Sequence, residues 1–255
     1  MDKIVFDYGH PTQSHPTNII GELLPKNKSS ISGTETYHVV KCQETVNKNF
    51  DTSKWIQLNN VIKKQRDLKI FSGLIVNDHD IVIKIGTSDT IKKEYAISQE
   101  LRAIGNFIKY LCYFTCNGNI NAIVSNSSIC AKEGEPINVL LMKHYKLGSI
   151  KNYNWDSNNF QILITLIKQI FAALYVAFNT YGFIHNDTHF GNFLISKTGM
   201  KVITHNEIIP IETNGYIAII MDFENSLKTN NIKSDGYFLL KSFQQIINNI
   251  LFELN

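Results

Sequence analysis

The spacing of apolar and polar residues becomes regular from residue 68 onward and predicts a β-hairpin there. Residues 68–76 and 81–85 are apolar runs rich in β-branched side chains, and the polar residues 77–80 separate them as a turn would. Side chains alternate between the two faces of a strand, so Ile83 and Ile85 face away from Lys84. Taken alone, this pattern predicts a lysine on the solvent-facing side of a sheet.

A helix is predicted to follow the hairpin. Residues 86–89 form a polar break in which Ser88 or Asp89 can cap a helix that runs to about residue 107. One face of this helix forms a stripe of Glu94, Ile97, Leu101 and Ile104.

Glu94 is unusual because it places a carboxylate within an apolar stripe. A buried carboxylate requires a partner, and Lys84 is the candidate for that role. Glu100 is the alternative carboxylate, but it lies well round the helix from the stripe.

The rest of the pattern mixes strands with helices, so an α+β fold class is expected. A long helix is predicted over residues 160–181, and Gly182 is expected to end it as a C-cap. Strands are expected at residues 107–115, 119–125 and 137–142, a hairpin at 192–196 and 201–204, a strand at 216–221 that ends at Asp222, and an amphipathic helix at 237–254 that follows Asp235.

Three parts of the chain are expected from this pattern. Residues 1–60 are an N-terminal extension of uncertain fold, in which Pro, Ser and Gly favour irregular chain and only residues 36–42 have the composition of a strand. Residues 61–145 form a β-rich lobe with its hinge, and residues 146–255 form a helical lobe. The polar stretch 143–149 with its glycine break is the expected hinge.

The composition is that of a globular protein. The chain has 255 residues, of which 44% are hydrophobic and 18% charged, and its net charge is +3. A disordered chain carries fewer apolar residues. The lysines are scattered along the chain, so no nucleic-acid partner is expected.

Neither secretion nor membrane insertion is expected. The amino terminus lacks the apolar core of a signal peptide. The apolar run 162–178 is interrupted by Lys168 and Gln169, which favours a buried helix over a membrane span. The four cysteines form no C-x-x-C pair and are expected as free thiols in a reducing compartment, with Cys112 and Cys116 as small buried apolar residues.

One short segment concentrates the residues that could carry chemistry. His185, Asp187, His189 and Asn192 lie between the long helix and a strand, and Asp222 ends a later apolar strand. A carboxylate that accepts a proton, with an amide and a second carboxylate that hold a metal, is the set that phosphoryl transfer needs. Magnesium prefers such oxygen ligands.

These residues resemble the motifs of the protein kinase superfamily. Residues 185–192 read His-Asn-Asp-Thr-His-Phe-Gly-Asn and resemble the H-x-D-x-x-x-x-N catalytic loop. Residues 222–224 resemble the D-F-G element, and residues 82–84 resemble the V-A-I-K strand. The resemblance covers about residues 68–250 and implies a bilobal kinase-like fold, with a β-rich N-lobe and a reduced helical C-lobe.

The resemblance also implies roles for the matched residues. Asp187 would be the catalytic base, assisted by Lys84 and His189, and the protein would transfer the γ-phosphate of ATP to a Ser or Thr hydroxyl of a protein substrate. Asn192 and Asp222 would hold Mg²⁺. The nucleotide-binding residues would be Lys84, Glu94, Met142, Lys143, His144, Tyr145, Asn192 and Asp222.

Details of the loop resemble particular branches of the superfamily. His189 stands where protein kinases have a lysine, a form similar to small-molecule kinases of the aminoglycoside and choline type and to haspin. The long interval from Asn192 to Asp222 also resembles haspin. Compact kinase-like proteins of large DNA viruses combine these features with sequences rich in Asn, Ile and Lys, so the expected location is the host cytoplasm or the virion.

Departures from the kinase pattern keep other functions open. No G-x-G-x-x-G precedes Lys84, and Glu224 replaces the glycine of the D-F-G element. A pseudokinase that acts as a binding or scaffolding module is therefore the alternative, and a small-molecule kinase is a second. A metal hydrolase built on His185, Asp187 and His189 is a further alternative.

Overall fold

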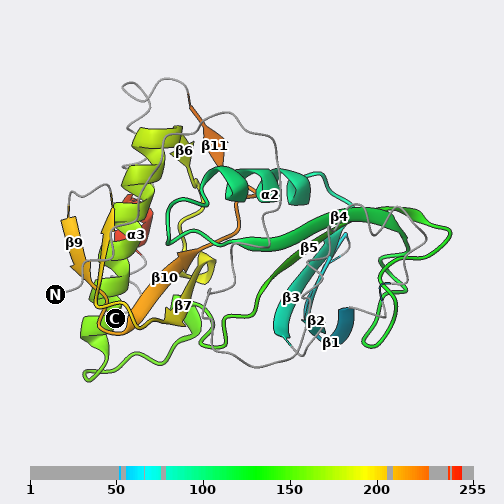
Figure 1. Cartoon of the computed structure of the whole chain (residues 1–255), viewed down its shortest axis with the longest axis horizontal. Helices are drawn as coiled ribbons and strands as arrows, with labels where there is room; N and C mark the ends of the chain where they lie inside the picture. The colour runs from blue at the N-terminus through cyan, green and yellow to red at the C-terminus, as the bar shows by residue number, and fades with distance from the viewer. Residues whose placement is uncertain are drawn as a thin grey trace, which may run out of the picture. The chain divides into compact units, whose positions relative to one another are not determined.

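The structure is a computed structural model that describes residues 52, 56–65, 67–75, 79–205, 209–229, 241 and 243–248 (Figure 1). The chain divides into two compact units. The first holds the residues up to Ser88 together with Leu111–Leu141, and the second holds Asp89–Tyr110 and the residues from Met142 onward. The described elements mix helices with strands, in agreement with an α+β class.

A five-stranded sheet in the order β1-β2-β3-β5-β4 is built mainly by the first unit. The predicted hairpin is confirmed, because β2 and β3 pair antiparallel from Leu68↔Gly86 to Ile75↔His79. Its turn is shorter than expected, since His79 and Asp80 already belong to β3. The strands are β1 (Ile56–Gln65), β2 (Leu68–Ile75), β3 (His79–Gly86), β4 (Tyr110–Gly118) and β5 (Glu135–Lys143).

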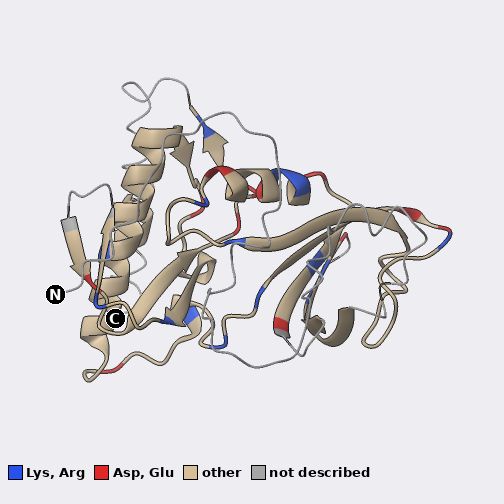
Figure 2. Cartoon of the chain, in the orientation of Figure 1, with Lys and Arg blue, Asp and Glu red and all other residues tan. Residues whose placement is uncertain are grey.

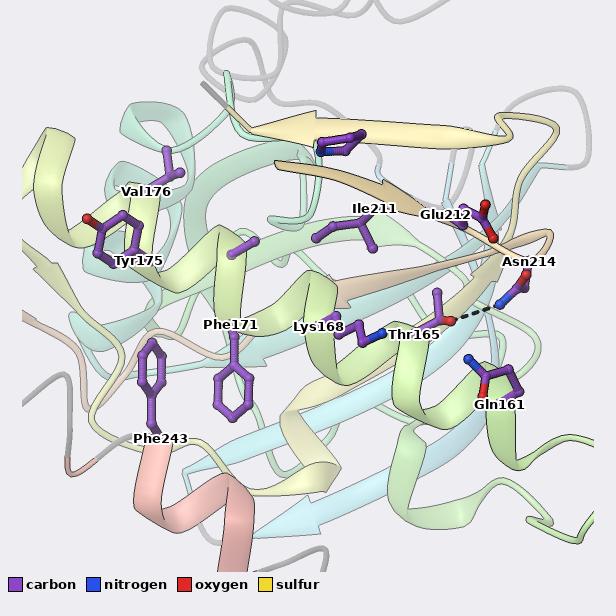
Figure 3. Close-up of a pocket in the computed structure, with 12 residues that line it drawn as sticks. Gln161, Thr165, Lys168, Phe171, Tyr175, Val176, Ile211, Glu212, Asn214 and Phe243 are labelled. Carbon is purple, nitrogen blue, oxygen red and sulfur yellow. Dashed lines mark hydrogen bonds between the residues drawn. The ribbon is translucent and has the colours of Figure 1, made fainter. Parts of the chain in front are cut away.

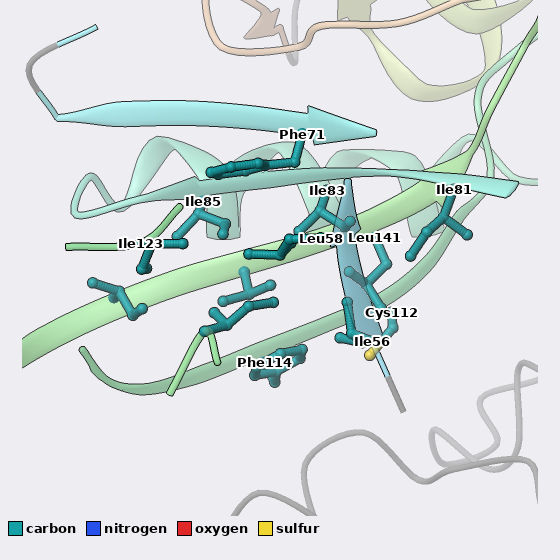
Figure 4. Close-up of a cluster of buried hydrophobic side chains, with 13 residues drawn as sticks. Ile56, Leu58, Phe71, Ile81, Ile83, Ile85, Cys112, Phe114, Ile123 and Leu141 are labelled. Carbon is teal, nitrogen blue, oxygen red and sulfur yellow. The ribbon is translucent and has the colours of Figure 1, made fainter. Parts of the chain in front are cut away.

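Alternate residues of these strands form the apolar core of the first unit, shown in Figure 4. Ile83 and Ile85 are fully buried there, as the period of two predicts. Lys84 is only 6% exposed, so the prediction of a lysine on the solvent-facing side of the sheet is wrong. A charge with so little access to water requires partners inside the fold.

Residues 119–125 were expected to form a strand but consist of turns. The Asn119 side chain accepts a hydrogen bond from the Asn121 N–H at 3.0 Å and so favours a turn over a ladder. Lys69, buried in β2, donates to the carbonyls of Asn121 and Ile123 at 3.1 and 2.8 Å. Burial, and then the charge of Lys64, lower the pKa of Lys69.

The prediction of free thiols is also wrong. Cys116 and Cys130 form a disulfide that closes this loop, Cys112 is disulfide-bonded as well, and no described cysteine is free. The two cysteines are 14 residues apart in the sequence, and this spacing alone does not predict a disulfide. The turns of the loop bring their Cα atoms to 5.7 Å, a distance typical of disulfide-bonded cysteines.

In the second unit, α2 (Thr90–Glu100) is shorter than the predicted helix, which was expected to reach about residue 107. The buried residues of α2 are Ile91, Glu94 and Ser98. The predicted stripe contained Ile97, and the buried residue at that level of the helix is Ser98 instead. Residues 101–107 form turns, after which Ile108 N–H donates to the carbonyl of Ile220 at 2.9 Å. The helix ends early because the following residues bond to β10.

The long helix α3 (Phe160–Tyr181) is confirmed, with Gly182 as its left-handed C-cap at φ 64°. It packs against β10 and β6. By length and composition it could cross a membrane, but 56% of its most apolar stretch is buried inside the fold, as expected for a core helix. The apolar residues at helical spacing along one face of α3 are all buried: Leu163, Leu166, Ile167, Ile170, Leu174 and Phe178.

The predicted hairpin of residues 192–196 with 201–204 is wrong. Strand β7 pairs with β10 from Phe193↔Ile220 to Lys197↔Tyr216, while β8 pairs with β9. Two nested ladders therefore replace one hairpin, and next to the outer ladder the Met221 N–H donates to the Asn192 carbonyl at 3.0 Å. The elements are β6 (Phe183–Ile184), β7 (Phe193–Lys197), β8 (Val202–His205), β9 (Ile209–Glu212), β10 (Tyr216–Ile220) and β11 (Leu227–Lys228), with short 3₁₀ turns η2 (Ile150–Asn152) and η3 (Phe190–Asn192).

Only part of the predicted C-terminal helix is described. Residues 241 and 243–248 are helical, and Phe243 packs on Phe171 of α3 with ring centroids 4.6 Å apart. Ile246 is fully buried whereas Ile247 is 42% exposed, so Ile246 and Phe243 lie on the inward side of these helical residues. Asp235 and residues 36–42 lie outside the described residues.

Candidate active site

The candidate site begins where α3 ends. Gly182 turns the chain into β6, whose Ile184 and Phe183 pair with Leu227 and Lys228 of β11. A Cβ at Gly182 would lie 1.9 Å from the carbonyl oxygen of Thr229, so only glycine fits. The helix cap and the β6–β11 ladder together fix the entry to the segment 185–192.

His185 is a buried structural residue at the base of this segment. Its Nε2 donates to the carbonyl of Met221 at 2.9 Å, and its ring edge contacts the rings of Phe183, Phe193 and Phe223. Burial lowers the pKa of His185, against the smaller opposing effects of the Met221 hydrogen bond and the Asp187 and Asp222 charges. The neutral imidazole therefore ties the segment to the end of β10.

Asp187 is partly exposed and lies among polar groups. Its carboxylate accepts a hydrogen bond from Asn225 Nδ2 at 3.3 Å, and the His189 Nε2 lies 3.7 Å from its other oxygen. His189 Nδ1 accepts from the Gly191 N–H at 3.0 Å, so in the neutral ring Nε2 carries the proton and faces Asp187. A Cβ at Gly191 would meet the His189 ring at 2.8 Å, which explains the glycine.

Asn192 connects Asp187 to β10. Its Nδ2 donates to the Asp187 carbonyl at 3.0 Å, and its own carbonyl accepts from the Met221 N–H at 3.0 Å. The side-chain nitrogen is thereby committed to the loop, which leaves the amide oxygen as the atom that could coordinate a cation. Residues 187, 192 and 221 are thus joined by two direct hydrogen bonds.

Asp222 adopts a left-handed backbone conformation, with φ 66°. The other described non-glycine residues with positive φ are asparagines, which tolerate this region better than most residues. Such a conformation costs about 1 kcal/mol or more, and it persists only where the surroundings fix it. Phe223, the next residue, is fully buried, and its ring lies 6.0 Å from that of Phe107 and 5.8 Å from that of Phe183.

Glu94 of α2 is buried at 2% exposure and accepts a hydrogen bond from the Tyr110 hydroxyl. Burial raises the pKa of Tyr110 well above its usual value, and the charges of Glu94 and Asp222 raise it further. The Asp222 backbone opposes this by hydrogen bonding to Tyr110. Tyr110 therefore links Glu94 to Asp222. The sequence offered no signal for it, because a tyrosine in a strand is ordinary core.

Several further contacts near the site could not be predicted from the sequence. Lys93 donates to the carbonyls of Glu224 and Ser226 at 3.2 and 2.9 Å and so attaches α2 to the segment after Asp222. Gln245 accepts from both the N–H and the hydroxyl of Thr188 at 2.9 Å, which attaches the C-terminal helical residues to the segment 185–192. Glu100, the alternative to Glu94, is exposed and pairs instead with Lys228 at 2.7 Å.

Residues 142–145 belong to the same unit. Met142 is buried, Lys143 lies over the Tyr145 ring at 5.8 Å, and burial raises the pKa of Tyr145 to about 12. His144 is partly exposed. Lys84 belongs to the first unit, so its predicted pairing with Glu94 stays a prediction.

The donor set fits magnesium better than zinc. Among the described residues, no group of three or more His, Cys, Asp or Glu side chains could hold a metal. His185 is buried and bonded to a backbone carbonyl, which speaks against the metal hydrolase alternative. Asn192 and Asp222 offer an amide oxygen and a carboxylate, the kind of sparse oxygen set that Mg²⁺ uses together with phosphates and water.

A cavity of about 730 Å³ lies elsewhere in the second unit, between α3, β9 and Phe243 (Figure 3). Its lining is mainly apolar and includes Phe171, Tyr175 and Ile211, with a hydrogen bond of 2.8 Å from Asn214 to Thr165 at one end. It contains none of the predicted site residues. Among the described residues, Lys and Arg occur in helices, strands and loops (Figure 2).

Comparison with known proteins gives weak, partial similarity to a kinase. No protein-family model matches the chain. A stretch of 62 residues is 34% identical to part of a Dictyostelium discoideum protein named as a probable serine/threonine-protein kinase. The matched stretch is 23% of this chain and 5% of that protein. The chain therefore spans a small part of that relative.

Two further relatives are uncharacterized proteins. One, from Invertebrate iridescent virus 6, is 35% identical over 74 residues, or 26% of this chain and 12% of the relative. The other, from Caenorhabditis elegans, is 30% identical over 76 residues, or 29% of this chain and 26% of the relative. Again, the chain spans only a minor part of each.

Proposed function

We propose that the protein is an ATP-dependent phosphotransferase of the Ser/Thr protein kinase type, with a bilobal kinase-like fold. The observation that carries the proposal is the link between Asp187, Asn192 and Asp222. Asn192 Nδ2 donates to the Asp187 carbonyl, the Met221 N–H donates to the Asn192 carbonyl, and Asp222 follows in a left-handed conformation. A candidate base is thus linked through two hydrogen bonds to two candidate metal ligands.

In this proposal each residue has a separate task. Asp187 accepts the proton of the substrate hydroxyl, while His189 donates toward the Asp187 carboxylate and orients it. Asn192 and Asp222 would hold Mg²⁺, which when bound neutralises charge on the phosphates of ATP. Lys84 and Glu94 act on the nucleotide, and Met142, Lys143, His144 and Tyr145 form its hinge contacts. The substrate is a protein with a Ser or Thr hydroxyl.

A pseudokinase that serves as a binding or scaffolding module is the second candidate. It is favoured by the connection between β1 and β2, whose paired residues Gln65 and Leu68 leave only two residues for the turn. So short a turn offers few backbone N–H groups to cover phosphates. Glu224 adds an exposed negative charge two residues after Asp222.

Nucleotide binding separates the proposed roles. We expect Mg-ATP to raise the melting temperature of the wild-type protein, Asp222→Asn to remove most of that rise, and Asp187→Asn to keep it. Asparagine tolerates the left-handed backbone, so Asp222→Asn removes the charge without adding strain. Glu224→Gln is the matched control for a nearby lost carboxylate and should respond as wild type.

A wild-type protein whose melting temperature does not respond to Mg-ATP would sink the active-kinase proposal and favour the scaffold. An equal loss of response in Asp187→Asn and Asp222→Asn would contradict the division between base and metal ligand. Thermal shift as a function of ATP concentration, with and without Mg²⁺, measures both.

A further inference from the structure

Tyr110 occupies a buried position that neither the sequence pattern nor the proposed reaction accounts for. It is 1% exposed and opens β4, and its hydroxyl donates to the Glu94 carboxylate. A phenylalanine would fill the same apolar space. A buried hydroxyl without a partner costs about 1–3 kcal/mol, so the Glu94 contact is what this hydroxyl requires.

Glu94 needs the contact as much as Tyr110 does. A carboxylate that is 2% exposed loses its hydration, and a hydrogen-bond donor recovers part of that loss. Because burial and the neighbouring Glu94 charge raise the pKa of Tyr110 well above its usual range, the phenol keeps its proton and remains a donor at every physiological pH.

The ring of Tyr110 reaches the other side of the site. It meets the Phe223 ring edge-to-face, with centroids 6.4 Å apart and planes at 73°. Phe223 is fully buried and directly follows Asp222, whose left-handed backbone requires support from its surroundings. Tyr110 therefore contacts both Phe223, the residue that follows Asp222, and the Glu94 carboxylate of α2.

We propose that Tyr110 is a positioning residue for the nucleotide site, whose O–H fixes the Glu94 carboxylate while its ring fixes Phe223 and thereby Asp222. Lys93, which bonds the carbonyls of Glu224 and Ser226, gives α2 a second attachment to the same segment. This inference rests on the proposed function, since it assigns Tyr110 to the site that would bind Mg-ATP.

Tyr110→Phe tests the hydroxyl and leaves the ring in place. Tyr113→Phe is the matched control, because the Tyr113 hydroxyl also donates to a partner inside the fold, Asn138 Oδ1 at 2.7 Å, but in the first unit. We expect both variants to lower the urea midpoint of unfolding. Only Tyr110→Phe should weaken Mg-ATP binding, by about tenfold, the factor that corresponds to about 1.4 kcal/mol.

A double-mutant cycle adds a readout that a merely structural tyrosine would not move. In a Glu94→Gln background, Tyr110→Phe should weaken Mg-ATP binding by less than it does in the wild-type background, because the carboxylate contact is already lost and only the hydrogen bond between the hydroxyl and the Asp222 backbone is left to remove. Equal binding by Tyr110→Phe and wild type, or fully additive losses in the cycle, overturns the inference alone. A wild-type protein that binds no Mg-ATP overturns the proposed function and this inference together.

Discussion

His185 illustrates at the scale of one residue how the site is tied to its core. Its imidazole is 1% exposed, donates to the Met221 carbonyl, and lies among aromatic rings. Because burial lowers its pKa below the ordinary 6.5, the folded protein holds it neutral while the unfolded chain protonates it at mildly acidic pH.

The stability that depends on neutral His185 is therefore present above pH 6.5 and is lost as the pH falls through the folded-state pKa. We expect the free energy of unfolding to fall below pH 6.5 more steeply in wild type than in His185→Gln, whose amide can donate to Met221 but does not titrate. The difference in slope is limited to about 1.4 kcal/mol per pH unit.

Urea unfolding at several pH values between about 5 and about 8 measures this difference. His189→Gln is the control, because it replaces a second histidine of the same segment whose side chain is 46% exposed rather than buried. Parallel pH profiles for wild type and His185→Gln would show that His185 does not titrate differently in the folded and unfolded chains.

Sequence reasoning found the candidate residues that lie in a local motif and missed those defined by packing. Asp187, His189 and Asn192 lie within six consecutive residues, and their contacts follow from that proximity. Tyr110, Asn225 and Gln245 reach the site only through the fold, so no spacing in the sequence reports them. The same limit hid the Cys116–Cys130 disulfide.

Among the elements, the junction of α3 with β6 positions the site most directly. Gly182 has φ 64°, and a Cβ there would lie 1.9 Å from the Thr229 carbonyl oxygen. Gly215 has a similar φ of 80° but open space around it. Alanine at position 215 would therefore report the cost of the left-handed backbone alone. Alanine at position 182 would add the cost of the close approach of Thr229.

We expect Gly215→Ala to lower the free energy of unfolding by about 1–2 kcal/mol, the cost of alanine in that backbone region. Gly182→Ala should cost at least about 2 kcal/mol more, because the Thr229 backbone must also move. Chemical denaturation of the two variants beside wild type measures both losses. Equal losses would show that the approach of β11 to Gly182 is not a packing constraint.

Short sequence patterns predicted a helix or hairpin well where its backbone hydrogen bonds join residues that are close in sequence. The helix α3, its glycine cap and the β2–β3 hairpin all follow from periodicity and turn residues. The pairing of β7 with β10 and the early end of α2 did not, because both depend on a partner strand far along the chain.

At the scale of the molecule, the mixed α+β class and the division into two compact units accord with the composition and length. The cytoplasmic location stays a prediction, and the disulfide bonds of the first unit argue against reducing surroundings. The proposed kinase activity is a claim about the whole chain, because the residues to which it is assigned, among them Lys84 and Asp187, occur in both units.

Phosphate transfer is the most direct measurement of that claim. The full chain would be incubated with Mg²⁺ and ATP radiolabelled on its γ-phosphate, with generic Ser/Thr protein substrates and with aminoglycosides and choline in a parallel series. Asp187→Asn is the matched variant, because it keeps the shape of the side chain and removes the proposed base.

The account predicts label on protein Ser or Thr for wild type and a loss of at least about 100-fold for Asp187→Asn. Label on the small molecules alone would contradict the protein-substrate assignment. Equal transfer by wild type and Asp187→Asn, or no transfer by a wild-type protein that binds Mg-ATP, would contradict the central claim that the network of Asp187, Asn192 and Asp222 transfers phosphate.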